Sequence, residues 1–214
     1  MSAKDRILGR LRAVQQPFAD VPPVESRRNM VPLADQSLET LKARFIQEAD
    51  KASMHIHHVA DHEAAIEQIL SLIGDDQAIS RWDSEQIGIP GLEEALDSAG
   101  IQRADTNDGS IRVGLTGADA ALAATGSLVI GSGSGRSRLA SLVPSAHVAV
   151  LRESQIVADL ETWFEQQRAA GLDDFRETSN ITLITGSSRT ADIAQELILG
   201  AHGPTEVHII LLAD

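Results

Sequence analysis

The spacing of apolar residues switches repeatedly between two periods along this chain, and this alternation limits its fold more than any other feature. Apolar residues recur every three or four positions over 61–73, as in a helix, and Gly74 ends that pattern. Short apolar runs such as 127–130 and 147–151 are typical of strands. Because parallel strands need a crossover to connect them, strands that alternate with helices predict a mostly parallel sheet covered on both faces. We therefore expect an α/β fold.

The same two periods place the expected elements along the whole chain. Helices are expected over 2–14, 37–51, 61–73, 92–98, 118–124, 158–170 and 190–197. Strands are expected over 54–59, near 78, and over 111–115, 127–130, 147–151, 181–185 and 206–212. The helix over 118–124 is an Ala-rich stretch with a Gly turn at each end.

The N-terminal residues differ in character from the rest of the chain. Four prolines fall within 17–32, where they remove helix and ladder donors. We expect residues 1–32 to form a helix and a Pro-rich arm, and residues 33–214 to form a single α/β domain. The arm is locally basic, so it either docks on an acidic partner or simply presents a solvated helix face.

The chain contains no cysteine, and this excludes several kinds of site. It cannot form a disulfide, a thiolate zinc site or a cysteine-ligated iron-sulfur cluster of its own, and it has no cysteine nucleophile. We therefore expect no cofactor bound by this chain, and any electron transfer to take place on another subunit.

The charge balance argues against a nucleic-acid-binding protein, and the hydropathy argues against an integral membrane protein. A formal net charge of −13 at pH 7 opposes the phosphate attraction on which nonspecific nucleic-acid binding depends, so no nucleic-acid partner is expected. No run of about 18 apolar residues occurs, and no signal-like segment follows Met1. We expect no integral membrane segment and a cytoplasmic location.

Two Gly turns with hydroxyl side chains are the strongest candidates for ligand binding. Thr116-Gly117 and Thr185-Gly186 each follow an expected strand and precede an expected helix, where free backbone N–H groups favour an anion. Open α/β sheets bind ligands outside the carboxyl ends of their strands. The alternative is that both turns are ordinary helix caps. The expected contacts to a small anionic ligand are Thr116, Gly117, Thr125, Gly126, Ser127, Arg136, Thr185, Gly186, Ser188 and Arg189.

The segment 131–138 alternates Gly with Ser and ends in two arginines. Arg136 is able to make bidentate contacts with a phosphate or carboxylate, which favours a mobile ligand loop. The segment lacks the ending of a nucleotide P-loop and the placement of a dinucleotide fingerprint. A plain hairpin tip is the alternative. We expect this loop and the loops that begin at 116 and 185 to share one pocket rim.

Three residues are candidates for a catalytic role. Asp119 and Asp192 are each expected in the first turn of a helix, where a carboxylate also stabilises the helix dipole by about 0.3–1 kcal/mol. His202 lies in the constrained turn 199–204, where it either acts chemically or ties a loop to backbone carbonyls. The histidines between 55 and 62 favour a half-exposed strand over a metal site, so no metal is expected.

In its second half the chain resembles the lactate-utilisation (LUD) domain family. The segments that carry the resemblance, in order, are Val113-Gly114-Leu115-Thr116 through Leu128, Gly135-Arg136-Ser137 with Leu142-Val143-Pro144, Ile184-Thr185-Gly186 through Ile193, and Leu199 through Pro204. The resemblance implies a three-layer α/β/α fold like that of sugar-phosphate isomerases and coenzyme A transferases. It also implies participation in the cytoplasmic oxidation of L-lactate to pyruvate, with Cys-rich iron-sulfur subunits as partners.

One departure from the family pattern bears on chemistry. Ala124 stands where the family is expected to place Glu, so a carboxylate nucleophile of the coenzyme A transferase kind is not expected. Three functions follow: a non-redox subunit or accessory factor of a lactate-oxidising system; a stand-alone enzyme acting on a small phosphorylated or carboxylated substrate; or a scaffold whose arm binds a partner.

Overall fold

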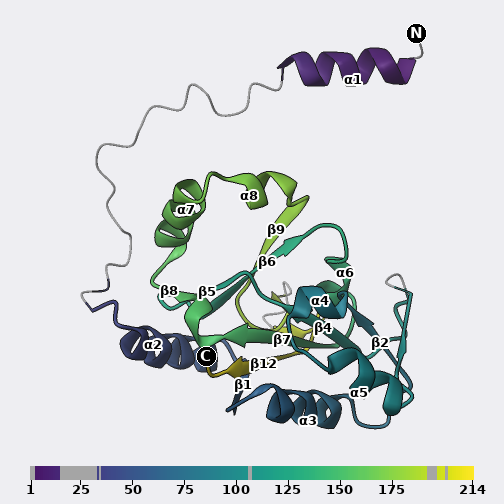
Figure 1. The fold of residues 1–214 in the computed structure, drawn as a ribbon, viewed down its shortest axis with the longest axis vertical. Coiled ribbons are helices and arrows are strands. Elements are labelled where there is room, and N and C mark those ends of the chain that lie inside the picture. The colour runs from purple at the N-terminus through teal and green to yellow at the C-terminus, as the bar shows by residue number, and fades with distance from the viewer. Residues whose placement is uncertain (1–2, 15–32, 34, 106–107, 192–196, 201) are drawn as a thin grey trace. The chain divides into compact units, whose positions relative to one another are not determined.

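The computed structural model describes residues 3–14, 33, 35–105, 108–191, 197–200 and 202–214 (Figure 1). The chain divides into two compact units, Met1–Met30 and Val31–Asp214. In the first unit the described residues form helix α1, Ala3–Val14, as the apolar spacing predicts. The proline-rich stretch predicted as an arm lies outside the described residues.

A six-stranded parallel sheet forms the centre of the second unit. Its strand order is β1 (His55–Val59), β12 (Glu206–Leu212), β7 (Ala146–Arg152), β4 (Val113–Gly117), β2 (Ala78–Arg81) and β3 (Gln102–Arg103). All five pairings in this sheet are parallel. The predicted parallel sheet is therefore confirmed for this part of the chain.

Helices surround the core of the second unit, and three of them begin at a side-chain cap. The helices are α2 (Leu38–Lys51), α3 (His62–Ile73), α4 (Ser84–Ile87), α5 (Leu92–Ser98), α6 (Leu139–Leu142), α7 (Leu160–Ala169) and α8 (Asp173–Glu177). Ser37, Asp61 and Asp159 each accept a hydrogen bond from the backbone N–H three residues further on. In Figure 1, α3 and α5 lie on the opposite side of the parallel sheet from α7 and α8.

A second, mixed sheet corrects the prediction of a single sheet. Its order is β8 (Ile156–Val157), β5 (Ala120–Leu122), β6 (Ser127–Ser132) and β9 (Asn180–Ile184). β6 is antiparallel to both β5 and β9, whereas β5 and β8 are parallel. A short 3-10 helix, Glu153–Gln155, links β7 to β8.

One helix prediction is wrong, and a second is contradicted at the ends that the structure describes. Residues 118–124 form β5 and the turn after it, because Ala120–Leu122 is buried between β6 and β8 and tertiary pairing overrides the helix propensity of Ala. A short, wholly buried apolar run does not distinguish strand from helix by its period. Within 190–197, the described ends are strands: β10 (Arg189–Ala191) pairs antiparallel with β11 (Leu197–Leu199).

Two apolar clusters hold the second unit together. The larger is mostly aliphatic and lies between the parallel sheet and its helices, with Phe45 and Trp82 as its largest members. The smaller packs Trp163 of α7 against the mixed sheet through Ala120, Leu122, Val129 and Val157. The mixed sheet therefore has its own apolar contacts with α7.

Candidate functional site

The topology of the parallel sheet creates a crevice at the carboxyl ends of β2 and β4. These strands are neighbours, but the chain leaves β2 through α4 and α5 toward β3, and leaves β4 through the mixed sheet and α6 toward β7. The two connections depart in opposite directions. Such a switch point is where open α/β sheets bind ligands, because no connection covers the strand ends there.

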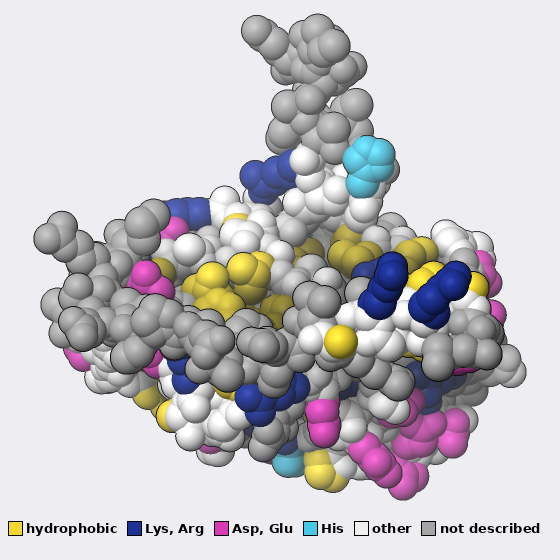
Figure 2. Space-filling view, turned by 90° about the horizontal axis from the view of Figure 1, so that it is seen from above, with side chains coloured by type: hydrophobic (Ala, Val, Ile, Leu, Met, Phe, Trp, Pro, Cys, Tyr) yellow, Lys and Arg dark blue, Asp and Glu magenta, His cyan; other side chains and the backbone are white. Residues whose placement is uncertain are grey.

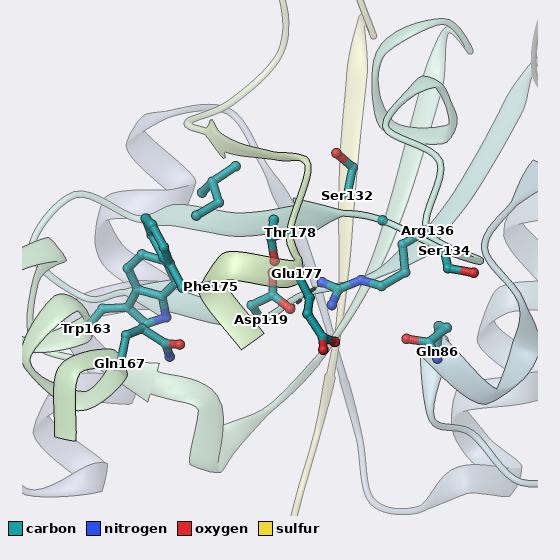
Figure 3. A pocket seen from close by; sticks show the side chains of 12 residues that line it. Gln86, Asp119, Ser132, Ser134, Arg136, Trp163, Gln167, Phe175, Glu177 and Thr178 are labelled. Carbon is teal, nitrogen blue, oxygen red and sulfur yellow. Dashed lines mark hydrogen bonds and ion pairs between the residues drawn. The ribbon is translucent and has the colours of Figure 1, made fainter. Parts of the chain in front are cut away.

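A pocket of about 510 Å³ opens beside this switch point (Figure 3). Gln86 reaches it from α4 after β2, Asp119 from the end of β4, and Arg136 from the loop after β6. The far wall comes from α7, α8 and the start of β9. The lining residues are Gln86, Asp119, Ser132, Gly133, Ser134, Arg136, Trp163, Gln167, Phe175, Glu177, Thr178 and Ile181.

Arg136 is the central side chain of the pocket. Its guanidinium forms an ion pair with Asp119, drawn as a dashed line in Figure 3, and its Cζ lies 4.5 Å from the centre of the Trp82 ring. The other Asp119 oxygen accepts a 2.5 Å hydrogen bond from the backbone N–H of Gly131. The Arg136 Nε is buried and has no hydrogen-bond partner among the described residues. Arg136 is thus fixed in place but keeps a donor unused.

The loop that carries Arg136 is held to the end of β2. The backbone N–H of Asp83 donates to the Gly135 carbonyl at 2.9 Å, and the Trp82 indole N–H donates to the Ser137 carbonyl at 3.1 Å. Gly135 has φ of 71°, and a Cβ there would collide with the Asp83 carboxylate. These contacts make the loop a wall of the pocket, and its mobility stays a prediction.

The opposite wall combines aromatic and polar groups. Trp163, Phe164 and Phe175 pack as tilted rings with centroids 5.0–6.4 Å apart, an arrangement that aromatic pairs prefer. Glu177 lines the pocket from the end of α8, and its side chain and those of Asp119 and Arg136 point into the same region (Figure 3). The face seen in Figure 2 has no uniform charge, because basic, acidic and apolar side chains all occur on it.

Five of the predicted ligand contacts meet elsewhere, at the other end of the β6–β9 pair. Ser127 is buried, and its Oγ lies 2.7 Å from the hydroxyl oxygens of both Thr125 and Thr185. Gly126 and Gly186 pack against the last turn of α2 and the residue after it. Because β6 and β9 are antiparallel, with Leu128 opposite Ile184 and Ser132 opposite Asn180, this end is remote from Arg136. The structure therefore separates the loops at 131 and 185, which were expected to share a rim.

The remaining predicted contacts also pack against protein. Thr116 is buried, and its Oγ1 lies 2.9 Å from His147 Nε2. Gly117 lies against the end of α4, where a Cβ would be 3.1 Å from the Gln86 carbonyl oxygen. Ser188 donates through its backbone N–H to the Pro204 carbonyl at 2.8 Å, and Arg189 donates to the Ser53 hydroxyl at 2.7 Å.

The three catalytic candidates have different outcomes. Asp119 lines the pocket. Asp192 lies outside the described residues. His202 is exposed in a bend and is not among the residues that line the pocket at the switch point. Of the three, Asp119 alone is placed by described contacts beside another charged group of the pocket.

Buried histidines form a separate feature of the sheet. Burial lowers the pKa of His147 to about 3, and its Nδ1 has no partner among the described residues. At the β1–β12 edge, the His208 ring stacks on His55 and His57, and burial is the main cause that lowers the pKa values of His57 and His208. No group of three or more possible metal ligands is found among the described residues.

Sequence reasoning missed several of the pocket residues, among them Gln86, Phe175 and Glu177. No motif marks them, since each is an isolated residue in or beside a short helix. One usable signal was present. Pairing the two predicted strands 127–130 and 181–185 as antiparallel neighbours would have placed the residues before 180 next to those after 132.

Comparisons with known proteins identify relatives along most of the chain. The LUD domain family model matches residues 42–212. Proteins called "Lactate utilization protein C" are similar: one from Exiguobacterium is 35% identical over 133 residues, and one from Macrococcus caseolyticus is 28% identical over 159. These alignments cover 62% and 70% of this chain but 52% and 67% of the relatives. The chain thus spans about half to two thirds of their length.

One solved structure has the same fold. It is a DUF162 family protein from Deinococcus radiodurans, with a TM-score of 0.62 and 21% identity, and the match covers 85% of this chain and 99% of that one. At this identity the likeness concerns the fold alone. In the part of the chain that the structure describes, no helix is long and apolar enough to cross a membrane.

Proposed function

The chain belongs to the LUD domain family, and from this premise we propose that it is a non-redox subunit or accessory factor of a cytoplasmic iron-sulfur system that oxidises L-lactate to pyruvate. The observation that carries the proposal is the family match over residues 42–212 together with the name shared by its relatives, "Lactate utilization protein C".

The division of labour follows from the chemistry of the reaction. Oxidation of lactate to pyruvate removes two electrons and two protons, which an acceptor must take up. Iron-sulfur clusters are held by cysteine thiolates, and this chain has no cysteine, so its residues do not fit such a cluster. We therefore assign the clusters to Cys-rich partner subunits, and to this chain a role in binding or assembly.

The proposal also covers the known enzymes to which the fold of this chain is related. The six-stranded parallel sheet and the helices around it support a relation to sugar-phosphate isomerases and coenzyme A transferases. Ala124 follows β5 and is buried, which supports the view that the chain has no carboxylate nucleophile of the transferase kind at that position.

Genetics and co-purification test the lactate role together. We expect deletion of the gene to slow growth on L-lactate but not on pyruvate, and we expect the tagged full-length chain to recover Cys-rich iron-sulfur proteins from lactate-grown cells. Growth on pyruvate is the control for general fitness. Unchanged growth on L-lactate, together with recovery of the chain alone, would refute the proposal.

A second candidate is a stand-alone enzyme that acts on a small phosphorylated or carboxylated substrate. The Arg136 guanidinium at the pocket favours it, because a guanidinium binds such anions, and Asp119 is placed to accept a proton. A thermal-shift panel of L-lactate, sugar phosphates and acyl-coenzyme A separates this candidate from the first. A ligand at about 100 times its Kd stabilises a protein by about 2.7 kcal/mol, and no shift with any of them contradicts the enzyme.

A scaffold role has one observation in its favour. Ile7 is 59% exposed on α1, a helix that also carries Lys4, Arg6 and Arg10, so a partner is able to cover an apolar and basic helix face. Removing residues 1–32 should abolish partner recovery if the chain is a scaffold of this kind, and should leave it intact if the pocket-bearing unit makes the contact.

A further inference from the structure

We propose that the pocket at the β2–β4 switch point binds a hydroxyl-rich ring, as found in a sugar or in the ribose of a nucleoside, in preference to a free phosphate or carboxylate. The inference goes beyond the lactate role and does not depend on it. It concerns what this pocket recognises, and it rests on the charge, the hydrogen-bonding groups and the size of the pocket.

The charges of the pocket argue against a free anion. Three ionisable side chains line it, Asp119, Arg136 and Glu177, and their formal charges sum to −1. The positive charge of Arg136 is already neutralised by Asp119, and Glu177 adds a second carboxylate. An incoming phosphate would meet both carboxylates at short range, where like charges repel each other. A neutral ligand avoids this repulsion.

The hydrogen-bonding groups of the pocket require both donors and acceptors from the ligand. The Arg136 guanidinium lines the pocket and only donates, so it requires an acceptor from the ligand. The carboxylates of Asp119 and Glu177 accept only, and a carboxylate oxygen has room for two hydrogen bonds. A hydroxyl group accepts from the guanidinium and donates to a carboxylate at the same time. A carboxylate satisfies the first requirement and fails the second, and a phosphate that keeps a P–OH donates only by bringing its negative charge beside Asp119 and Glu177.

The amide side chains extend the same pattern. Gln86 and Gln167 reach the pocket from α4 and α7, on opposite sides in Figure 3, and Ser134 contributes a hydroxyl from the loop after β6, whereas the Ser132 hydroxyl already donates to the Asn180 carbonyl. Amides and hydroxyls both donate and accept, so they match several ligand hydroxyls at once.

The size and the apolar wall indicate a ring. The volume of about 510 Å³ lies within the range of pockets that hold drug-sized ligands, and is far larger than a three-carbon acid needs. Phe175 and Ile181 line the pocket beside the edge of Trp163, so a flat ring has an apolar surface to cover. A ring whose edge carries hydroxyls fits both kinds of wall.

Binding measurements on the purified full-length chain test this inference. The probes are D-glucose, D-ribose and adenosine, with inorganic phosphate and L-lactate compared under the same conditions by saturation-transfer NMR and titration calorimetry. We expect at least one hydroxyl-rich probe to bind at least tenfold more tightly than phosphate or lactate. Equal binding of ribose and adenosine shows that the sugar suffices, and tighter binding of adenosine shows that its base covers the aromatic wall; either supports the inference.

Two variants tie the binding to this pocket. Glu177→Gln should weaken the bound probe at least tenfold, because it removes a charged acceptor from the pocket. Glu67→Gln makes the same change on the exposed face of α3 and should leave binding unchanged. Circular dichroism checks that both variants fold.

Three results overturn the inference: no hydroxyl-rich probe binds, phosphate or lactate binds more tightly than all of them, or Glu177→Gln binds as the parent does. None of these results bears on growth on L-lactate, so a failure here is distinguishable from a failure of the lactate role.

Discussion

The two ends of the β6–β9 pair look alike in sequence and differ in what they contact. At one end, Thr125-Gly126-Ser127 meets Thr185-Gly186 in a chain of hydroxyl groups against the last turn of α2. At the other end, the Gly-Ser segment after Ser132 borders a pocket that holds Arg136 and Asp119. Both are rich in Gly and hydroxyls, and the sequence predicts ligand contacts at both.

The two ends differ in the atoms that lie next to their glycines. A Cβ on Gly126 would lie 2.5 Å from the Glu48 carbonyl carbon, and a Cβ on Gly186 would collide with the Ala52 carbonyl. For a Cβ on Gly131, at the pocket end, the three nearest atoms would all be side-chain atoms, of Asp119, Thr178 and Arg136. Glycine at the first end lets two backbones touch, whereas glycine at the second leaves room for side chains to gather around a cavity.

The largest expected effect is on stability at the packed end. Gly126→Ala should lower the free energy of unfolding by about 2–5 kcal/mol, because its φ of 67° strains an L residue and the backbone of α2 cannot yield. Gly131→Ala is the matched control, and we expect a loss of about 1 kcal/mol because side chains move aside. Urea denaturation measures both. Equal losses would remove the distinction between the ends.

Thr116, another predicted ligand residue, proved to be packed against His147. Acid should destabilise the chain through this histidine. The folded pKa of His147, about 3, lies below the ordinary 6.5, so between these values the unfolded state binds a proton that the folded state does not. Stability is therefore complete above pH 6.5 and falls as the pH is lowered, by about 2 kcal/mol at pH 5.

His147→Gln isolates this contribution. The pKa values of His57 and His208 are also lowered, so the parent chain loses stability from all three histidines, and the difference between parent and variant belongs to His147. Urea midpoints at pH 5 and pH 7 provide the measurement. Parallel pH profiles for the two proteins would contradict the assignment.

A smaller effect is expected from the hydroxyl chain. Ser127→Ala removes two hydrogen bonds from a buried site and should cost about 1–2 kcal/mol in the free energy of unfolding. Ligand binding at the pocket should be unchanged, because the residue lies at the other end of β6. A loss of probe affinity without a loss of stability would show that this end also contacts the ligand.

The smallest effect on stability is expected at the pocket. The Asp119 and Arg136 side chains are 30% and 22% exposed, so Asp119→Asn should cost at most about 1 kcal/mol, while the amide still accepts from Gly131. Affinity for the hydroxyl-rich probe should fall, since a charged acceptor is lost. Calorimetry and urea denaturation on the same sample measure the two effects. If Asp119→Asn lost much stability but still bound the probe, the pocket end of the β6–β9 pair would be the packed end and not the binding end.

Much of the fold was predictable because it depends on local signals. The strands at 127–130, 147–151 and 206–212 and the capped helices beginning after Ser37 and Asp61 were all expected from periodicity and capping. The strand within 118–124, predicted as a helix, was not predictable in this way. Its strand conformation depends on pairing with β6 and β8.

The candidate site was predictable only in its individual members. Arg136 was singled out by its Gly-rich segment and Asp119 by its expected place in the first turn of a helix that does not form, and the structure joins the two in one ion pair. Glu177 and Gln86 carry no motif, and they reach the pocket through the order of strands in two sheets.

By itself, the sequence determined the alternation of helices and strands, the caps that begin the helices, and the absence of cysteine ligands, because each of these depends on residue type or on neighbours a few positions away. The tertiary structure alone decided which Gly turn packs and which borders a cavity. That choice depends on residues far apart in the chain, such as Gly126 against α2 and Glu177 beside Arg136, and such contacts exist only once both sheets have formed.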